Sequence, residues 1–361
     1  MSDKKTTYRE HTDMENTLKL RQVLATLPPF CKDYFRAIDT TTTAKTRISY
    51  AYDIRIIFQF LLDENPAFKD HAMTDFTVDV LDQIKAVYLE EYQEYLKLYQ
   101  SGDKTETNGE RGLKRKISAL RSFYAYYYKR EMIHTNPTVL IDVPKIHEKS
   151  IIRLDIDEVA MLLDYIEHCG DTLTGQKRVF YEKTKERDLA IVTLLLGTGI
   201  RVSECVGLDI EDVDFKNNGI KVTRKGGNEM VVYFGPEVEK ALKRYLEVRE
   251  GITPLAGHEH ALFYSTQRRR IGVQAIENLV KKYAREITTT KKITPHKLRS
   301  TYGTTLYQET GDIYLVADVL GHKDVNTTRK HYAAMAEENR KKAASSVNVN
   351  YEHWTEDHAE H

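Results

Sequence analysis

The spacing of apolar residues predicts that the first part of the chain is helical. Apolar side chains recur at every fourth position in one early segment, at Ile48, Tyr52, Ile56 and Phe60. That repeat places them on one face of an amphipathic helix. A second helical stretch, rich in tyrosine, is predicted over residues 77–99, and a polar loop that contains glycine over 101–110.

The stretch 112–128 combines an apolar helical face with a basic one. The apolar positions are Leu113, Ile117, Leu120, Tyr124 and Tyr127. The other face carries cations and hydroxyls, at Lys114, Arg115, Ser118, Arg121 and Ser122. Side chains of these types contact phosphates and base edges. We therefore expect DNA contacts from this face, with an ordinary solvated basic face as the equal alternative.

A polar segment that contains proline divides the chain. Asn136 and Pro137 end the preceding helix, because proline disfavours a helical conformation in the residue before it. The segment 142–150 is polar and basic, which suits a linker. The predicted organisation is a polar lead-in with at most one short helix (1–28), a helical domain (29–145), a linker (146–152), a second domain (153–347) and a tail (348–361).

The second domain is predicted to be mostly helical with one small sheet. Helical patterns cover 155–167 and 184–197, and short alternating runs with glycine- and asparagine-containing turns follow at 208–234. Such runs are typical of antiparallel strands. From Pro236 to about residue 347 the pattern is again mainly helical. The expected fold class is mainly α with a small antiparallel β-sheet, in two domains.

Composition indicates a soluble globular protein, and the spacing of its cysteines and histidines indicates no metal site. Of the 361 residues, 41% are hydrophobic and 30% are charged, and no apolar run is long enough to span a bilayer. The N-terminal segment lacks the apolar core of a secretion signal, so we expect a cytoplasmic protein. Cys31, Cys169 and Cys205 are widely separated and are expected to be inert free thiols. The histidines at 258–260 and in the tail lack a rigid ligand spacing.

Charge is balanced over the whole chain but unevenly distributed. The 54 basic and 54 acidic residues give a net charge of zero, which alone argues weakly against a nucleic-acid partner. The segment 265–300, however, contains ten lysines and arginines, and its only acidic residues are Glu277 and Glu286. A basic surface on a neutral protein can still bind phosphates. The DNA contacts expected from this region are Arg268, Arg269, Arg270 and Lys297.

Two segments early in the second domain contain candidate catalytic residues. In 197–204 (GTGIRVSE), glycines end a buried helix and can place Arg201 at the edge of the core. The alternative is that the helix simply ends here and Arg201 lies on the surface in solvent. Glu204 is expected to orient a cation, and core packing or an acid on the helix surface would explain it equally well. In 223–229 (TRKGGNE), Lys225 lies at the tip of a predicted hairpin, where surface lysines are common.

Two later segments add histidines, an arginine and a tyrosine. In 294–300 (TPHKLRS), His296 and Arg299 share one face at the start of a helix, where free N–H groups and cationic donors suit a phosphate. In 319–332 (VLGHKDVNTTRKHY), His322 follows a glycine and Tyr332 comes ten residues later. With 23 tyrosines in the chain, a single tyrosine more often packs than reacts. Tyr332 is a candidate only because the arginines, lysine and histidines of the other segments accompany it.

Together these segments resemble the tyrosine recombinase (phage-integrase-like) family. The family's ordered active-site set is matched by Arg201, Lys225, His296, Arg299, His322 and Tyr332. The resemblance extends over about residues 30–347 and is strongest to the simple Xer-type recombinases of bacteria, particularly the kind that acts singly. Ser300 stands where relatives often have histidine, at a position that varies in the family.

The resemblance implies strand transfer through a 3′-phosphotyrosyl intermediate, without a metal or a cofactor. The implied roles are nucleophile for Tyr332, clamps on the phosphate oxygens for Arg201 and Arg299, general base for His296, general acid for Lys225 and phosphate ligand for His322. Two guanidiniums can stabilise the charge that builds on the phosphate oxygens. A divalent ion is then unnecessary.

The resemblance also implies partners and a biological role. It implies a double-stranded DNA target and a tetramer on two DNA sites, and it allows a DNA translocase or another division protein as an accessory partner. Resolution of chromosome dimers is the expected role, with a recombinase or integrase of a mobile element as the main alternative. A type IB topoisomerase and a DNA-binding protein without catalysis are further alternatives. Covalent adducts and recombination between two sites would distinguish them.

Overall fold

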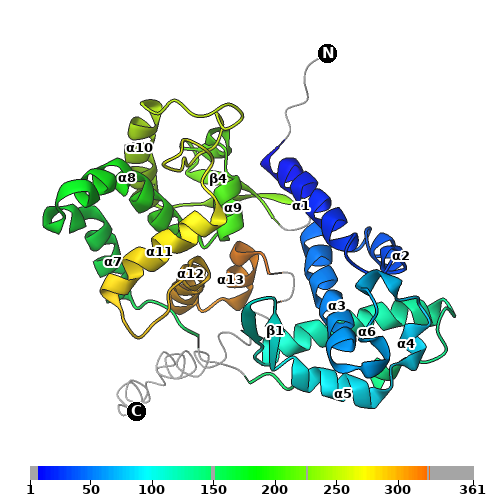
Figure 1. Ribbon diagram of the computed structural model, residues 1–361. Helices are drawn as coiled ribbons and strands as arrows, with labels where there is room; N and C mark the ends of the chain where they lie inside the picture. The colour runs from blue at the N-terminus through cyan, green and yellow to red at the C-terminus, as the bar shows by residue number, and fades with distance from the viewer. Residues whose placement is uncertain (1–6, 148–150, 225–226, 323–324, 326–361) are drawn as a thin grey trace, which may run out of the picture. The chain divides into compact units, whose positions relative to one another are not determined.

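The computed structural model describes residues 7–147, 151–224, 227–322 and 325 (Figure 1). The chain forms two compact units, Met1–Lys149 and Ser150–His361. The division between them falls within the segment 146–152 that was expected to be a linker. Within the described ranges, no helix combines the length and the apolar character that crossing a membrane requires.

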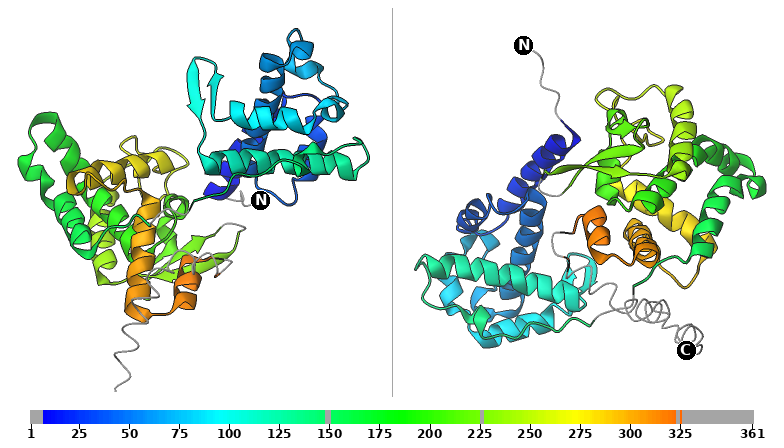
Figure 2. Two further views of the ribbon diagram at one scale, coloured as in Figure 1. Left: turned by 90° about the horizontal axis from the view of Figure 1, so that it is seen from below. Right: turned by 180° about the vertical axis from the view of Figure 1, so that it is seen from behind.

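The first unit consists of helices and one hairpin (Figure 2). Its α-helices are α1 (Tyr8–Leu24), α2 (Cys31–Ala37), α3 (Ala44–Glu64), α4 (Val80–Gln83), α5 (Ala86–Tyr95) and α6 (Glu110–Lys129). Its 3-10 helices are η1 (Pro66–Phe68), η2 (Met73–Asp75) and η3 (Pro137–Val139). Helix α3 packs against α1, α5 and α6, and is therefore the centre of this unit.

Aromatic side chains fill the core of the first unit. The ring centroids of Phe58 and Phe30 are 6.0 Å apart, and those of Phe58 and Phe123 are 6.4 Å apart, in edge-to-face arrangements. The hydroxyl of Tyr34 donates to Ser122 Oγ at 2.9 Å, and that of Tyr127 donates to the Phe30 carbonyl at 2.8 Å. Because the hydroxyls are paired, tyrosines can occupy the core.

The structure differs from the expected elements at three places in the first unit. Residues 77–99 contain two short helices, α4 and α5, instead of one. A hairpin replaces the end of the predicted helical stretch and part of the predicted loop at 101–110, with strands β1 (Leu98–Ser101) and β2 (Lys104–Thr107). Its residues are mostly exposed, so no apolar alternation marks them in the sequence. The lead-in contains the 17-residue helix α1, which is longer than the short helix expected there.

The second unit is built around the long helix α8. Its helices are α7 (Ile156–His168), α8 (Gly175–Thr198), α9 (Val202–Gly207), α10 (Pro236–Glu250), α11 (Val273–Ile287), α12 (Pro295–Thr310) and α13 (Ile313–Leu320), with 3-10 helices η4 (Cys169–Thr172) and η5 (Ile210–Asp212). Residues 189–195 of α8 are all buried. Helices α7, α10 and α12 pack around it.

The predicted antiparallel sheet is present in the second unit. Strands β3 (Val213–Asp214), β4 (Gly219–Thr223) and β5 (Glu229–Tyr233) pair in that order, with Ile220 opposite Val232. From Pro236 onward the described residues are mainly helical, as expected, but residues 251–272 interrupt the helices with turns and isolated bridges. Glycines and a proline at 251–257 account for the interruption, because both residues disfavour helix interiors.

The three cysteines are buried free thiols, as the sequence predicts. Burial raises the pKa of the Cys205 thiol to about 12 and also raises the pKa of Cys169. A thiol with a raised pKa carries little of the reactive thiolate at neutral pH. The cysteines therefore serve packing.

Candidate active site

Arg201 lies at the start of α9, two residues after the glycine that ends α8. Gly199 has φ +61°, and a Cβ there would lie 2.3 Å from the ring of Tyr302, so backbone and packing both require glycine. The Arg201 side chain is 36% exposed, and its Nη1 donates to Glu204 Oε1 at 2.7 Å. Arg201 is thus held at the edge of the core, unlike an ordinary surface arginine.

Glu204 holds Arg201 at two points. Its side chain is 3% exposed, and besides the guanidinium it accepts the backbone N–H of Arg201 at 2.8 Å. A carboxylate at the third helical position that accepts this N–H also stabilises the start of α9. The geometry fits the orienting role expected for Glu204.

Arg299 is buried in α12 and binds two backbone carbonyls. The residue is 4% exposed. Its Nη1 donates to the Gly199 carbonyl at 2.5 Å, and its Nη2 donates to the Leu320 carbonyl. A buried guanidinium needs such partners. Arg299 therefore ties the turn before Arg201 to the end of α13.

These contacts bring three predicted residues together at the end of α13. Arg201 Nη2 donates at 3.4 Å to the carbonyl of Gly321, which is 120 residues away in the chain. Gly321 ends α13 with φ +60°, and the N–H of the next residue, His322, donates to the Ala317 carbonyl at 2.9 Å. Arg201, Arg299 and His322 thus surround one helix end, whose partial negative charge stabilises the guanidiniums.

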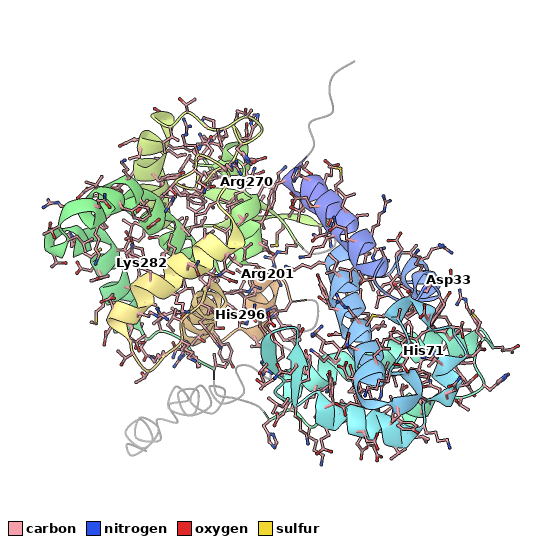
Figure 3. All side chains as sticks on the ribbon, viewed as in Figure 1. Asp33, His71, Arg201, Arg270, Lys282 and His296 are labelled. Carbon is pink, nitrogen blue, oxygen red and sulfur yellow. The ribbon has the colours of Figure 1, made fainter. Side chains whose placement is uncertain are left out.

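His296 lies in the first turn of α12 and is exposed (Figure 3). As predicted, the helix begins at Pro295. His296 precedes Arg299 by three residues, so the two lie on one side of the helix, with the histidine nearer its N-terminal end. The start of α12 therefore presents an exposed imidazole ahead of the buried guanidinium.

Two members of the predicted catalytic set, Lys225 and Tyr332, lie outside the described residues. Lys225 follows directly on Arg224, the last described residue of that segment. Their roles stay predictions from the sequence.

Arg224 reaches the same helix end, although sequence reasoning did not single it out. Its Nη2 donates to the Val319 carbonyl at 2.6 Å. The sequence offers no direct signal for this contact, because an arginine beside a hairpin lysine looks like an ordinary surface cation. Only the packing of the hairpin against α13 distinguishes it.

The basic face of α6 divides into exposed and engaged side chains. Lys114 and Ser118 are exposed. Arg115 is 47% exposed and pairs with the carboxylate of the buried Asp53 on α3. Arg121 donates to the carbonyls of Thr138 at 3.1 Å and Ile141 at 2.6 Å, so its guanidinium holds the segment after α6 in place.

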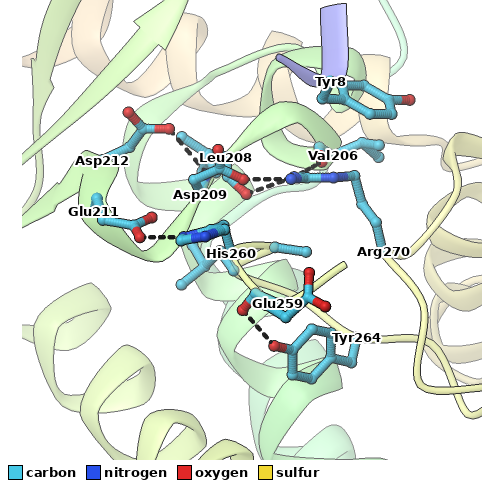
Figure 4. A network of polar contacts seen from close by, with 12 residues as sticks. Tyr8, Val206, Leu208, Asp209, Glu211, Asp212, Glu259, His260, Tyr264 and Arg270 are labelled. Atoms are coloured by element: carbon cyan, nitrogen blue, oxygen red, sulfur yellow. Dashed lines mark hydrogen bonds and ion pairs between the residues drawn. The ribbon is translucent and has the colours of Figure 1, made fainter. Parts of the chain in front are cut away.

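The basic residues predicted to contact DNA from the second unit also include both exposed side chains and one that binds the protein itself. Arg268 and Arg269 are exposed, and Lys297 is half-buried in α12. Arg270 is 11% exposed and donates to the carbonyls of Val206 at 2.9 Å and Leu208 at 2.7 Å and to the carboxylate of Asp209 (Figure 4). This guanidinium therefore supports the chain just after α9.

Comparison with known proteins identifies relatives over nearly the whole chain. Residues 153–339 match the phage integrase family. The chain is 30% identical over 357 residues to tyrosine recombinase XerS of Lactococcus lactis subsp. cremoris (strain MG1363), which covers 92% of this chain and 98% of that protein. It is 32% identical over 313 residues to tyrosine recombinase XerC of Caldanaerobacter subterraneus subsp. tengcongensis, covering 84% of this chain and 82% of that protein.

Solved structures share the fold. The XerH site-specific recombinase bound to a palindromic difH substrate has a TM-score of 0.59 at 21% identity, covering 84% of this chain and 79% of that one. The Tn1549 transposon integrase in complex with circular intermediate DNA has a TM-score of 0.61 at 22% identity, covering 85% of this chain and 98% of that one. This chain therefore shares the fold of two-domain tyrosine recombinases, and it is mainly helical with small antiparallel sheets, as the sequence predicts.

Proposed function

Because the chain belongs to the phage integrase family and is a site-specific tyrosine recombinase of the Xer type, we propose that it resolves chromosome dimers. The observation that carries the proposal is the likeness to XerS, which extends over 92% of this chain and so includes both units. In this role the protein recombines two copies of one chromosomal site, and acts on the nucleoid in the cytoplasm.

In the proposed reaction, Tyr332 attacks a phosphodiester of the DNA. The phenol oxygen forms a bond to phosphorus, and the bond from phosphorus to the 5′-oxygen breaks. The products are a 3′-phosphotyrosyl enzyme and a free 5′-hydroxyl. Since one phosphodiester replaces another, the 5′-hydroxyl of a second strand can reverse the step without ATP.

The arginines stabilise the charge that develops on the phosphate. Arg201 uses two of its five N–H donors on Glu204 and Gly321 among the described residues, so it retains donors for the non-bridging oxygens. Arg299 acts from the adjacent buried position and adds the second positive charge. Forked, permanently charged donors suit a phosphate that becomes more negative in the transition state.

The remaining residues move protons and hold the phosphate. His296 accepts the proton of the Tyr332 hydroxyl, because an imidazole is a suitable base near neutral pH. Lys225 gives a proton to the leaving 5′-oxygen. His322 donates a hydrogen bond to a phosphate oxygen from its place beside the two arginines.

The proposed partners are duplex DNA and further copies of the chain. XerH is bound to its difH substrate in its solved structure, and a lambda integrase dimer is bound to a core site. We expect this chain to bind its own site in the same manner and to form a tetramer on two sites, with a DNA translocase or another division protein as accessory partner. Lys114, Ser118, Arg268 and Arg269 are the exposed candidates for DNA contacts, and Lys297 is a half-buried one.

Mapping the DNA that the protein occupies in cells tests this role. Immunoprecipitation of the full-length protein followed by sequencing should give one main peak near the replication terminus. Deletion of the gene should then leave unresolved chromosome dimers in dividing cells. Peaks at the ends of a mobile element, with normal segregation after deletion, would instead identify a mobile-element recombinase and reject the proposal.

A further inference from the structure

Arg224 connects two segments that carry proposed catalytic residues. Its backbone closes the turn after β4, with its N–H donating to the Asn228 carbonyl at 2.8 Å and its carbonyl accepting the Gly227 N–H at 3.0 Å. Its side chain leaves the hairpin and donates to the Val319 carbonyl, 95 residues away in the chain. Lys225 is the next residue on one side of this contact, and His322 lies three residues beyond Val319 on the other.

The Arg224 guanidinium packs directly against Gly321. A Cβ at position 321 would lie 1.3 Å from Nη1 of Arg224. Gly321 also has φ +60°, which favours glycine for backbone reasons. With the guanidinium in this position, nothing larger than hydrogen fits beside it. The hairpin and the last turn of α13 are therefore in close contact through Arg224.

Among the described residues, the buried guanidinium of Arg224 is only partly hydrogen-bonded. Its Nε and Nη1 are buried and have no hydrogen-bond partner among the residues that the structure describes. Burial lowers the pKa of Arg224, and the nearby Arg201 lowers it further, while Glu204 and Asp318 oppose the shift. Unpaired buried donors are rare in folded proteins because they are expensive. A buried polar group with few partners in a native protein therefore calls for an explanation, such as a functional role.

Three arginines from three elements share the last turn of α13. Arg224, Arg299 and Arg201 donate to three successive carbonyls, those of Val319, Leu320 and Gly321. Two of the three are the proposed phosphate clamp, and the third belongs to the β4–β5 hairpin. Arg224 thus connects the hairpin to the helix end that both clamp arginines bind.

We infer that Arg224 is a positioning residue, which fixes the hairpin to the last turn of α13 and so places Lys225 for proton transfer to the phosphate that Arg201 and Arg299 hold. The inference rests on the proposed function, in which Lys225 protonates the leaving 5′-oxygen. Loss of Arg224 releases the hairpin from α13. Proton delivery then slows, while the clamp of Arg201 and Arg299 remains.

DNA with sulfur in place of the bridging 5′-oxygen tests the inference. A thiol is far more acidic than an alcohol, so a thiolate leaves without receiving a proton. Arg224→Ala should cleave ordinary DNA about 100-fold more slowly than the wild-type protein, within the range expected for lost general-acid catalysis. On the sulfur substrate it should cleave at close to the wild-type rate, as Lys225→Ala should.

Matched variants separate positioning from other effects. Arg201→Ala should be slow on both substrates, because the clamp stabilises the phosphate whatever group leaves. Lys221→Ala removes a cation whose side chain is 51% exposed on β4 and should cleave both substrates normally. Arg224→Lys keeps a charge and a donor and should recover part of the rate. It also replaces Arg224→Ala in the comparison should that variant fail to fold.

The outcomes distinguish this inference from the proposed function. If Arg224 variants stay slow on the sulfur substrate while Lys225→Ala is restored, the inference is wrong and the general-acid role of Lys225 stands. If Lys225→Ala itself is not restored, both are wrong. The double variant Arg224→Ala/Lys225→Ala should be no slower than Lys225→Ala, since both changes affect one step. An additive loss would also overturn the inference.

Discussion

At the residue scale, the two proposed clamp arginines differ in their surroundings. Arg201 is partly exposed and is oriented by a buried carboxylate, whereas Arg299 is buried and bound to carbonyls of two different segments. Substitution of Arg201 is therefore suited to measuring its contribution to the cleavage reaction. Changes at Arg299 will also disturb packing, because removal of its guanidinium leaves two buried carbonyls without these donors.

Arg201→Ala should lower the rate of strand cleavage by about 100- to 1,000-fold, the loss typical of removing one donor that stabilises transition-state charge. Affinity for the DNA site should change by only a few-fold, because many other phosphate contacts remain. Single-turnover cleavage and gel-shift titration measure the two effects. Arg244→Ala, which removes a cation bound to Glu167 and Glu186, is the control and should cleave normally. Equal losses of binding and cleavage in Arg201→Ala would contradict this assignment.

Glu204→Gln should lower the cleavage rate by roughly tenfold, the size of effect expected when an orienting hydrogen-bond partner is weakened. The amide keeps the shape and one acceptor oxygen but loses the charge that holds Arg201. The melting temperature should fall only slightly. Glu186→Gln, which weakens another carboxylate–arginine pair, serves as the control. An unchanged cleavage rate in Glu204→Gln would contradict the orienting role and leave Glu204 with a role in packing alone.

At the element scale, helix α6 separates DNA-binding candidates from structural arginines. Lys114 is exposed, while Arg121 holds the carbonyls of Thr138 and Ile141. Position on the basic face of a helix is therefore an incomplete guide, since a long side chain can turn back to the protein's own backbone.

Lys114→Ala should reduce the dependence of DNA affinity on salt by about one unit of the log–log slope, because one phosphate contact is lost. Arg121→Ala should leave that slope unchanged and lower thermal stability instead. Fluorescence titrations at several salt concentrations and a thermal scan measure both quantities. The reverse pattern, with a changed slope only for Arg121→Ala, would show that the assignments are exchanged.

The sequence allowed prediction of elements whose signals are local. Proline at 295 marks the start of α12, and the glycine at 199 marks the end of α8, because each acts on its own backbone. The β1–β2 hairpin was missed because its exposed strands lack apolar alternation. The contact between Arg224 and Val319 depends on packing between segments 95 residues apart, so no local pattern reveals it.

At the scale of the whole molecule, buried tyrosines make stability sensitive to alkaline pH. Burial raises the pKa of Tyr34 and of Tyr245, one in each unit, to about 12. Below about pH 10 the phenols are neutral in both the folded and the unfolded chain, so their contribution is complete. Above that pH the unfolded chain loses protons first, and the free energy of unfolding should fall.

Urea unfolding measured from about pH 8 to about pH 11 should therefore show a steady loss of stability above about pH 10. Tyr245→Phe should weaken this pH dependence, because phenylalanine has no proton to lose. Tyr233→Phe, at an exposed position, is the matched control and should leave the dependence as it is. A profile in Tyr245→Phe that overlays the wild-type one would contradict the attribution to this buried phenol.

The residue that becomes joined to DNA is the most direct measure of the central claim. A nicked duplex that carries the recombination site and loses its short 5′-hydroxyl fragment on cleavage traps the intermediate. Mass spectrometry of the digested complex should find the DNA 3′-phosphate on Tyr332, and Tyr332→Phe should give no adduct. An adduct on another residue, or one that persists in Tyr332→Phe, would contradict the account.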